Sequence, residues 1–226
     1  LHRLVLSSDA YAMTSSISPN NHSKDATNRW LWRANRTPLD AESLRDAMLF
    51  VAGDLDTSTP QPHPFPAVNT WKFTIHNPFH ATYENDRRSI YLMSQRNRRH
   101  PFLTLFDAAD PNMSVAARFP TITPNQTLYL MNSPFVAARA KSLATLLLSE
   151  TGPEEQRIRT AVERTHGTAA SSEQVAEILA FLHSFPAQLP PEISASTKPQ
   201  ENAPQLAAWT ALSRVLLTSN AFLYVD

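Results

Sequence analysis

The chain has 226 residues with three glycines, 18 prolines and no cysteine, and its 20 basic side chains balance its 20 acidic ones. This composition excludes disulfides, thiolate metal sites, covalent haem attachment, glycine-rich phosphate loops and a Gly-x-Ser-x-Gly nucleophile motif. Balanced charge gives no electrostatic reason to expect a nucleic-acid partner, and no apolar run reaches the roughly 18 residues of a membrane span.

The N-terminal part predicts a short helix, a polar loop and then one well-marked helix. Residues 2–12 carry spaced apolar side chains, whereas residues 14–28 are rich in Ser and Asn. Thr37 and Pro38 suit the cap and the first position of a helix. This helix is expected to run to Gly53, because an apolar stripe continues at helical spacing. The stripe consists of Leu44, Ala47, Met48 and Val51.

The middle of the chain, residues 54–122, is predicted to be irregular. Prolines interrupt it repeatedly, and proline suits neither a helix interior nor a central strand. Two short apolar runs within it, residues 71–75 and 89–93, predict one short β-hairpin. Residues 101–106 are long enough for one or two turns of helix. The middle therefore adds little regular structure to a chain that is otherwise helical.

The C-terminal part is predicted to be a helical bundle, because serine, threonine and proline mark successive helix starts. These starts are Thr123-Pro124, Ser133-Pro134, Gly152-Pro153 and Ser171-Ser172. A proline-rich linker, 186–204, precedes a last helix at roughly 204–219, and the apolar tail 222–225 is expected to pack back. The predicted fold is mainly α, divided into a helical core, 1–150, and a C-terminal helical subdomain, 151–226.

Basic side chains gather in one window of the middle segment that contains no acid. They are Arg87, Arg88, Arg96, Arg98, Arg99 and His100. Guanidinium groups bind carboxylate, sulfate and phosphate bidentately, so an anionic ligand is one interpretation. The candidate ligand-binding residues are Arg87, Arg88, Tyr91, Arg118 and Asn132. The alternative is that these arginines pair with nearby aspartates. Aromatic interleaving is too weak to suggest nucleic acid.

Two carboxylates and a carboxamide follow at close spacing: Asp107, Asp110 and Asn112. Two carboxylates can act as general acid and base, and the three groups together offer oxygen ligands for a metal such as Ca²⁺. Aspartate is also a favoured cap, and Asp-Pro-Asn is a turn sequence, so a purely structural role is the alternative. No metal is assigned from this pattern.

Aromatic side chains give a weaker signal. Trp30, Trp32 and Trp71, with Tyr83 and Tyr91, could form a surface on which sugar rings stack. Aromatic side chains of this kind also pack in cores and at their edges. Both interpretations stay open at the level of sequence.

Several strings of the chain resemble one family, in order from the first residue to the last. They include Leu1-His2-Arg3-Leu4, Trp32-Arg33-x-Asn35-Arg36, Leu44-Arg45-Asp46, Arg87-Arg88-Ser89-Ile90-Tyr91-Leu92, Phe106-Asp107-x-x-Asp110-Pro111-Asn112, Asn132-Ser133-Pro134-Phe135-Val136 and Phe222-Leu223-Tyr224-Val225-Asp226. The chain resembles the planctomycete-specific domain of unknown function that follows cytochrome c-like and cytochrome-associated domains in large exported proteins. It looks like the C-terminal portion of that domain.

The resemblance implies a setting rather than an activity. It implies a periplasmic or cell-surface location, with upstream domains of the same polypeptide and an anionic polysaccharide as partners. Any haem would lie in those upstream domains, so no cofactor is expected in this chain. Members of the family often carry a cysteine where this chain has residues 114–118, so a thiol is not essential.

Two functional hypotheses follow. The leading one is an accessory binding or scaffold domain of an exported multidomain bacterial protein, linked to polysaccharide use or electron transfer. The alternative is a hydrolase-like enzyme that acts on glycans, with Asp107 and Asp110 as acid and base beside an arginine anion site. The sequence leaves open whether the chain is an enzyme.

Overall fold

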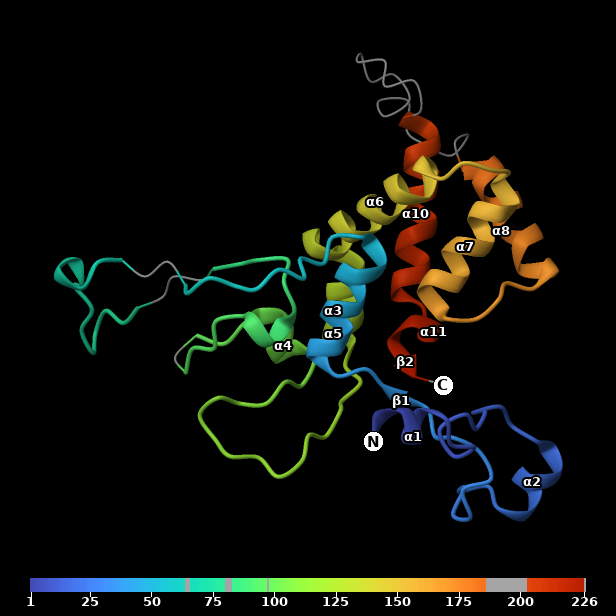
Figure 1. Cartoon of the computed structure of the whole chain (residues 1–226), viewed down its shortest axis with the longest axis horizontal. Helices are drawn as coiled ribbons and strands as arrows, with labels where there is room; N and C mark the ends of the chain where they lie inside the picture. The colour runs from blue at the N-terminus through green and yellow to red at the C-terminus, as the bar shows by residue number, and fades with distance from the viewer. Residues whose placement is uncertain (64–65, 80–82, 97, 186–202, 226) are drawn as a thin grey trace.

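The computed structural model describes residues 1–63, 66–79, 83–96, 98–185 and 203–225. As predicted, the fold is mainly α: helices form a body from which two less regular segments extend (Figure 1). The N-terminal segment lies beside one end of the body, near the C-terminus, and an arm drawn in teal reaches away on the opposite side. Among the described residues, no helix combines the length and apolar character that crossing a bilayer takes.

The N-terminal segment carries two short helices, α1 (His2–Leu6) and α2 (Pro19–Lys24), neither of which buries a side chain. The predicted helix over residues 2–12 therefore ends early. The hydroxyl of Ser8 donates to the carbonyl of Val5 at 2.7 Å. Such a local side-chain bond competes with continuation of the helix.

Helix α3 (Ala41–Ala52) begins later than predicted, and its cap is Asp40, whose carboxylate accepts from the N–H of Ser43 at 2.7 Å. The prediction of Thr37 as cap was wrong. Thr37 and Pro38 form β1 (Thr37–Pro38), which pairs antiparallel with β2 (Tyr224–Val225) from the far end of the chain. The helix ends as predicted at Gly53, which has a left-handed φ of 77°.

The β-hairpin predicted for residues 71–75 and 89–93 of the middle segment does not form there. Residues 71–75 form no strand, and residues 89–93 begin with the 3-10 turn η2 (Ser89–Tyr91); a second turn, η1 (Val68–Thr70), lies in the arm. The backbone N–H of Ser89 donates to the Asp46 carboxylate at 2.7 Å. This segment therefore satisfies its backbone against α3 rather than against a second strand.

The later helices confirm the predicted starts. Thr123 and Ser171 each close a capping box, Ser133 caps the helix that follows it, and Gly167 ends another in a left-handed conformation. The helices are α4 (Pro101–Leu105), α5 (Pro124–Asn132), α6 (Pro134–Ser149), α7 (Glu154–His166) and α8 (Ser172–Ser184).

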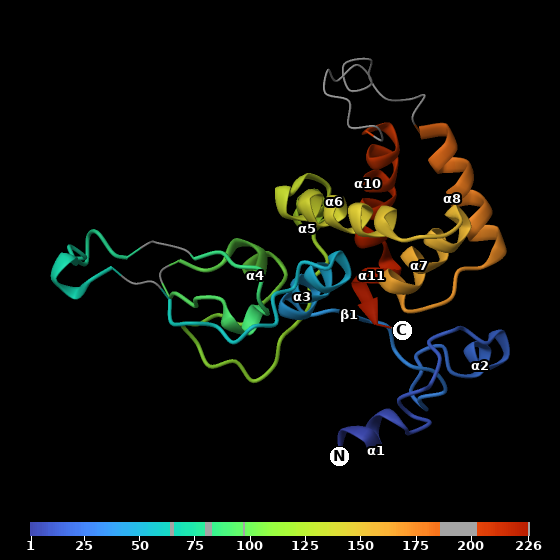
Figure 2. The ribbon, with the colours of Figure 1, turned by 45° about the horizontal axis from the view of Figure 1, so that its top comes forward.

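The last helices, α10 (Ala203–Thr218) and α11 (Asn220–Leu223), return the chain to the body. Of the predicted linker, residues 186–202 lie outside the described residues. Helix α10 packs against α6, and together with α3 and α7 these helices enclose the core (Figure 2). The largest fully buried side chains include Met48, Leu143, Leu147, Ile158, Trp209 and Leu217. The division at residue 150 stays a prediction. The tail packs back as expected, with Phe222 5% exposed.

Two polar groups in this core offer a stability test. Trp209 Nε1 and Ser213 Oγ lie on α10, both in residues that are 0% exposed, and neither has a hydrogen-bond partner in the described part of the chain. A buried polar group without a partner costs about 1–3 kcal/mol. We therefore expect Ser213→Ala to raise the free energy of unfolding by about 1 kcal/mol in urea denaturation.

Thr165→Val is the matched comparison for this test. The Thr165 hydroxyl is buried too, but it donates to the carbonyl of Ala161 at 2.7 Å. Its removal is expected to lower the free energy of unfolding. If Ser213→Ala lowers the free energy of unfolding as much as Thr165→Val does, the Ser213 hydroxyl has a hydrogen-bond partner in solution.

Candidate functional site

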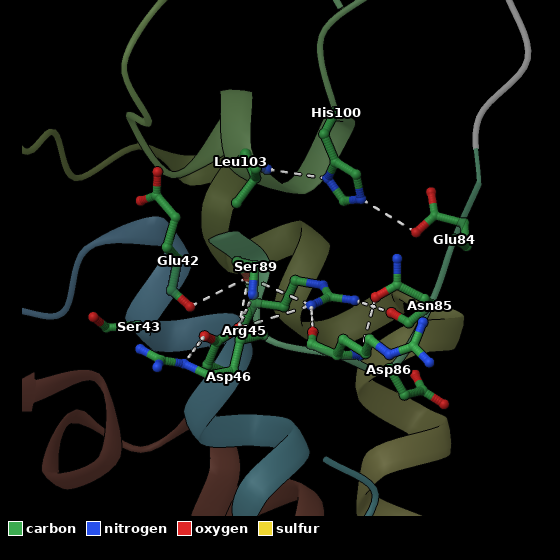
Figure 3. A network of polar contacts seen from close by, with 12 residues as sticks. Glu42, Ser43, Arg45, Asp46, Glu84, Asn85, Asp86, Ser89, His100 and Leu103 are labelled. Atoms are coloured by element: carbon green, nitrogen blue, oxygen red, sulfur yellow. Dashed lines mark hydrogen bonds and ion pairs between the residues drawn. The ribbon is translucent and has the colours of Figure 1, made fainter. Parts of the chain in front are cut away.

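Helix α3 presents a buried cation to the irregular segment that crosses it. Arg45 is 3% exposed. Its guanidinium donates from Nη1 to the backbone carbonyl of Arg87 at 2.9 Å and from Nη2 to that of Asn85 (Figure 3). Nη1 also reaches the Ser89 hydroxyl at 3.4 Å. Because a buried charge must be compensated by hydrogen bonds, Arg45 and this segment stabilise each other.

Burial and neighbouring charges act on Arg45 in opposite directions. Desolvation lowers the pKa of its guanidinium, and the carboxylates of Asp46, Glu84 and Asp86 counter that effect. A guanidinium remains protonated in proteins. The positive charge is therefore present at the centre of this network at any physiological pH.

Asp46, the next residue of α3, completes the network. Its Oδ1 accepts from both the backbone N–H and the hydroxyl of Ser89, each at 2.7 Å. Its Oδ2 lies 3.8 Å from Nε of Arg88. We call Arg45, Asp46 and Ser89 the α3 network. It attaches the segment that contains Arg87 and Arg88 to helix α3.

An open groove of about 560 Å³ lies beside this network. Helix α3 contributes Glu42 and Asp46 to its wall, and α4 contributes Leu103. Three arginines from the middle of the chain also line it: Arg88, Arg99 and Arg118. The groove therefore brings together guanidinium groups that are up to 30 positions apart in the sequence.

Two of the groove arginines have close acidic partners. Arg118 makes a bidentate pair with Glu42 at 2.6 and 3.1 Å, and this hydrogen bonding raises the pKa of Arg118. Arg99 Nη1 lies 3.2 Å from Asp110 Oδ2. The hypothesis that the arginines pair with acids thus describes these two side chains well.

Arg88 differs from them. Its side chain is 64% exposed, and its ion pair with Asp46, at 3.8 Å, is longer than a hydrogen bond. It makes no side-chain hydrogen bond with the residues that the structure describes. The donors of Arg88 are therefore available to a ligand.

The other predicted ligand-binding residues lie elsewhere. Arg87 pairs with Asp56, Nε to Oδ2 at 3.0 Å, and lines a separate pocket with Tyr91. Asn132 donates from Nδ2 to the carbonyl of Leu128 on its own helix at 2.9 Å and lines neither cavity. The structure thus brings Arg88 and Arg118 together but does not bring the five candidates to one site.

Asp107 has a structural role. It follows α4 with a left-handed φ of 61°, and the N–H of Ala108 donates to the carbonyl of Leu103 at 2.9 Å. Asp107 therefore ends this helix in the way that glycine commonly does. Its Oδ2 accepts from the N–H and the hydroxyl of Thr121, at 2.6 and 2.8 Å.

Asp110 is engaged as well. Its Oδ1 accepts from the backbone N–H and the Nδ2 of Asn112, at 2.9 and 3.0 Å. The backbone hydrogen bond, with Arg99 nearby, lowers the pKa of Asp110. Neither Asp107 nor Asp110 lines the groove. In the described residues, no group of three or more His, Asp or Glu side chains comes together as a metal site.

The predicted aromatic surface is divided among separate parts of the molecule. Trp30 and Trp32 lie in the N-terminal segment, where the Trp32 Nε1 donates to the carbonyl of Asp25 at 2.9 Å. Trp71 lies in the arm, 6.0 Å from Phe73 between ring centroids. These tryptophans therefore do not form one stacking surface.

Sequence reasoning named none of the three α3 network residues as site residues, and Arg45 is the one that the sequence signals most clearly. It lies on the buried stripe of α3 between Leu44 and Met48, both of which are at most 2% exposed. Arginine is rarely buried without partners. A charged residue on the apolar face of a predicted helix was therefore the available signal for a buried polar network.

The comparisons with known proteins give one match. A family model described as "PSD1: Protein of unknown function (DUF1553)" matches residues 1–182. No curated protein and no solved structure matches the chain. The matched range includes α3, the groove and both of the candidate carboxylates.

Proposed function

The chain belongs to the PSD1 family of proteins of unknown function (DUF1553), and from that premise we propose that it is an accessory binding or scaffold domain. Its groove receives an anionic group, carboxylate or sulfate, of a polysaccharide ligand. It works in an exported multidomain bacterial protein, at the periplasmic side or the cell surface. Upstream domains of the same polypeptide are its partners, and any haem belongs to them.

The exposed guanidinium of Arg88 in the groove is the observation that carries this proposal. The groove is lined by three arginines and by three carboxylates, and two of the arginines, Arg99 and Arg118, donate to Asp110 and Glu42. Arg88 keeps its donors for a ligand, and a guanidinium presents them in a fork that fits carboxylate and sulfate. The α3 network fixes the residue next to it, Ser89, so the backbone that carries Arg88 is pre-organised.

The two candidate carboxylates favour binding over catalysis. A general acid must hold a proton near the working pH, but the hydrogen bonds of Asp110 lower its pKa. Both oxygens of Asp110 have partners, and one oxygen of Asp107 is taken by Thr121. A glycan-active enzyme that uses this pair is therefore the less supported alternative.

We test the proposal with Arg88→Gln, which removes the charge and keeps most of the side-chain length. Titration calorimetry with oligogalacturonate and with a sulfated oligosaccharide is expected to show binding to the wild-type chain. Binding to Arg88→Gln should be about tenfold weaker or more, because charge-assisted hydrogen bonds are worth about 1.5–3 kcal/mol each.

Arg214→Gln is the matched control, since Arg214 is an exposed arginine of α10, outside the groove. Its affinity for both ligands should equal that of the wild type. Two results would contradict the proposal: no binding of either ligand to the wild-type chain, or equal affinities of wild type and Arg88→Gln. Hydrolysis of either ligand, lost in Asp107→Asn, would support the enzyme alternative instead.

A further inference from the structure

A second cavity, of about 490 Å³, lies next to the groove and shares His100 with it. We call it the aromatic pocket. Its walls come mainly from α4, α5 and the start of α6, and its rim comes from the irregular segment before Arg87. The wall residues include Pro101, Phe102, Tyr129, Pro134 and Phe135. None of these residues is among the predicted site residues.

The aromatic walls are held in one arrangement. Phe102 is 2% exposed and packs edge-to-face against Tyr129 and Phe135, with ring centroids 5.7 and 5.8 Å apart. The helices that carry the rings are capped at the pocket itself. His100 accepts from the N–H of Leu103 at the start of α4, and Ser133 caps α6. A ligand would therefore meet rings that need little reordering.

The rim of the aromatic pocket is acidic. Glu84 and Asp86 stand at it with side chains that are 65% and 54% exposed. Oε2 of Glu84 lies 3.2 Å from His100 Nε2, and Oδ1 of Asp86 lies 3.2 Å from Arg139 Nη1. Among the residues that the structure describes, the second carboxylate oxygen of each has no donor, so it can accept from a ligand.

The charges around the pocket leave an excess of negative charge. Arg139 is shared between Asp86 and Asp54, the latter at 3.0 Å. The guanidinium of Arg45 is the other cation, and it donates to two backbone carbonyls of the crossing segment and lies 3.8 Å from Asp46 Oδ1. The residues that line the pocket include two carboxylates, Glu84 and Asp86, and one guanidinium, that of Arg45.

The aromatic walls already accommodate cations. The guanidinium carbons of Arg45 and Arg139 lie 5.8 and 5.5 Å from the ring centroid of Phe135, within the range of cation–π attraction. Tyr129 has no such cation in the described part of the chain, although it is half-buried and its ring lines the same cavity. Tyr129 packs edge-to-face with Phe102 and Phe106, and it is an aromatic ring of the acidic-rimmed pocket that has no cation beside it in the described residues.

We propose that the aromatic pocket binds a lysine or arginine side chain of a protein partner. The aliphatic stem of such a side chain lies along Tyr129, and its charged end meets Glu84 and Asp86. An anionic group would be repelled by the rim, and a wholly apolar side chain would leave desolvated carboxylates without partners. This site differs from the groove in position, charge and ligand class, so the inference goes beyond the proposed function.

The experiment uses a fluorescently labelled hexalysine peptide with the full chain, at low salt. Fluorescence anisotropy is expected to show saturable binding, whereas hexaglutamate and hexaglutamine should not bind. Glu84→Gln with Asp86→Asn removes both rim charges and should weaken hexalysine binding about tenfold or more. Glu84→Gln alone changes a largely exposed side chain, so it is expected to weaken hexalysine binding with little effect on folding.

Two further variants distinguish binding in this pocket from nonspecific electrostatic attraction of a polycation. Tyr129→Leu keeps every charge but removes the aromatic ring, and it should weaken binding several-fold. Glu177→Gln removes an exposed carboxylate of α8, away from the pocket, and should leave the affinity unchanged. Absence of hexalysine binding, or equal affinities of wild type, Glu84→Gln and Tyr129→Leu, would overturn the proposal. Binding of hexaglutamate in place of hexalysine would overturn it too.

Discussion

Arg45→Met is expected to lower the free energy of unfolding by about 3 kcal/mol. The substitution keeps an unbranched side chain of similar length but removes the guanidinium. Backbone carbonyls of Asn85 and Arg87 then lose their donor, and the Ser89 hydroxyl loses a further contact. Urea denaturation followed by circular dichroism measures the change in stability. Hydrogen exchange should also show faster exchange of the Ser89 amide.

Two comparisons make the Arg45 prediction specific. Arg45→Lys keeps the charge but lacks the planar guanidinium that reaches several acceptors. Its free energy of unfolding is therefore expected to lie between those of the wild type and Arg45→Met. Arg214→Met changes an exposed arginine and should alter stability by less than about 0.5 kcal/mol. If Arg45→Met unfolds at the wild-type urea concentration and the Ser89 amide stays protected, the α3 network does not hold the crossing segment.

The same substitution links stability to binding. Arg45 does not line the groove, but it fixes the backbone that carries Arg88. Arg45→Met is therefore expected to weaken the binding of anionic oligosaccharide even under conditions in which the protein is folded. An unchanged affinity would show that the groove tolerates a loosened segment.

Leu143→Ala is expected to lower the free energy of unfolding by about 3–4 kcal/mol. Leu143 is 0% exposed on α6, in the core that α6 forms with α3 and α10. Its truncation removes buried apolar surface and leaves a cavity that helices on several sides cannot easily close. Thermal and urea denaturation should both report the loss.

Leu128→Ala is the matched control for this prediction, because Leu128 lies on α5 with 55% of its surface exposed. Its effect is expected to stay within about 0.5 kcal/mol. A loss for Leu143→Ala as small as that for Leu128→Ala would mean that the core around α6 is not closely packed.

Local sequence chemistry predicted most of the helices in this protein. The starts of α5, α6 and α8 follow caps whose hydrogen bonds span two or three residues, such as Thr123 with Gln126 and Ser171 with Gln174. Glycine ends α3 and α7 because a left-handed φ suits it. These helix starts and ends depend on residues that are at most three positions apart. They can therefore be recognised in the sequence without knowledge of the fold.

The errors arose where a distant segment competed with a local preference. Thr37 and Pro38 fit a helix start, but the N–H of Leu39 donates to the carbonyl of Leu223 and the chain there pairs with the C-terminal tail. Residues 89–93 fit a strand, but Ser89 bonds to Asp46, 43 positions earlier. Propensities are weak compared with such tertiary contacts.

The candidate site could be predicted only in part, because it too depends on contacts between distant segments. Sequence reasoning singled out the arginine window and the two aspartates, and it left ligand binding and structural pairing as alternatives. The partners that distinguish them are far away along the chain: Glu42 lies 76 positions from Arg118, and Thr121 lies 14 positions from Asp107. Arg88 stands out only after those pairs are known.

By itself, the sequence determined that this is a mainly α protein without cysteine chemistry or a glycine-rich loop, and it determined where most helices begin and end. These properties depend on composition and on contacts within a few residues. Only the tertiary structure decided which charges are engaged, which arginine remains available, and that an aromatic pocket with an acidic rim lies beside the groove. The physical reason is that ion pairs and cavities are formed between segments, whereas a cap is formed within one.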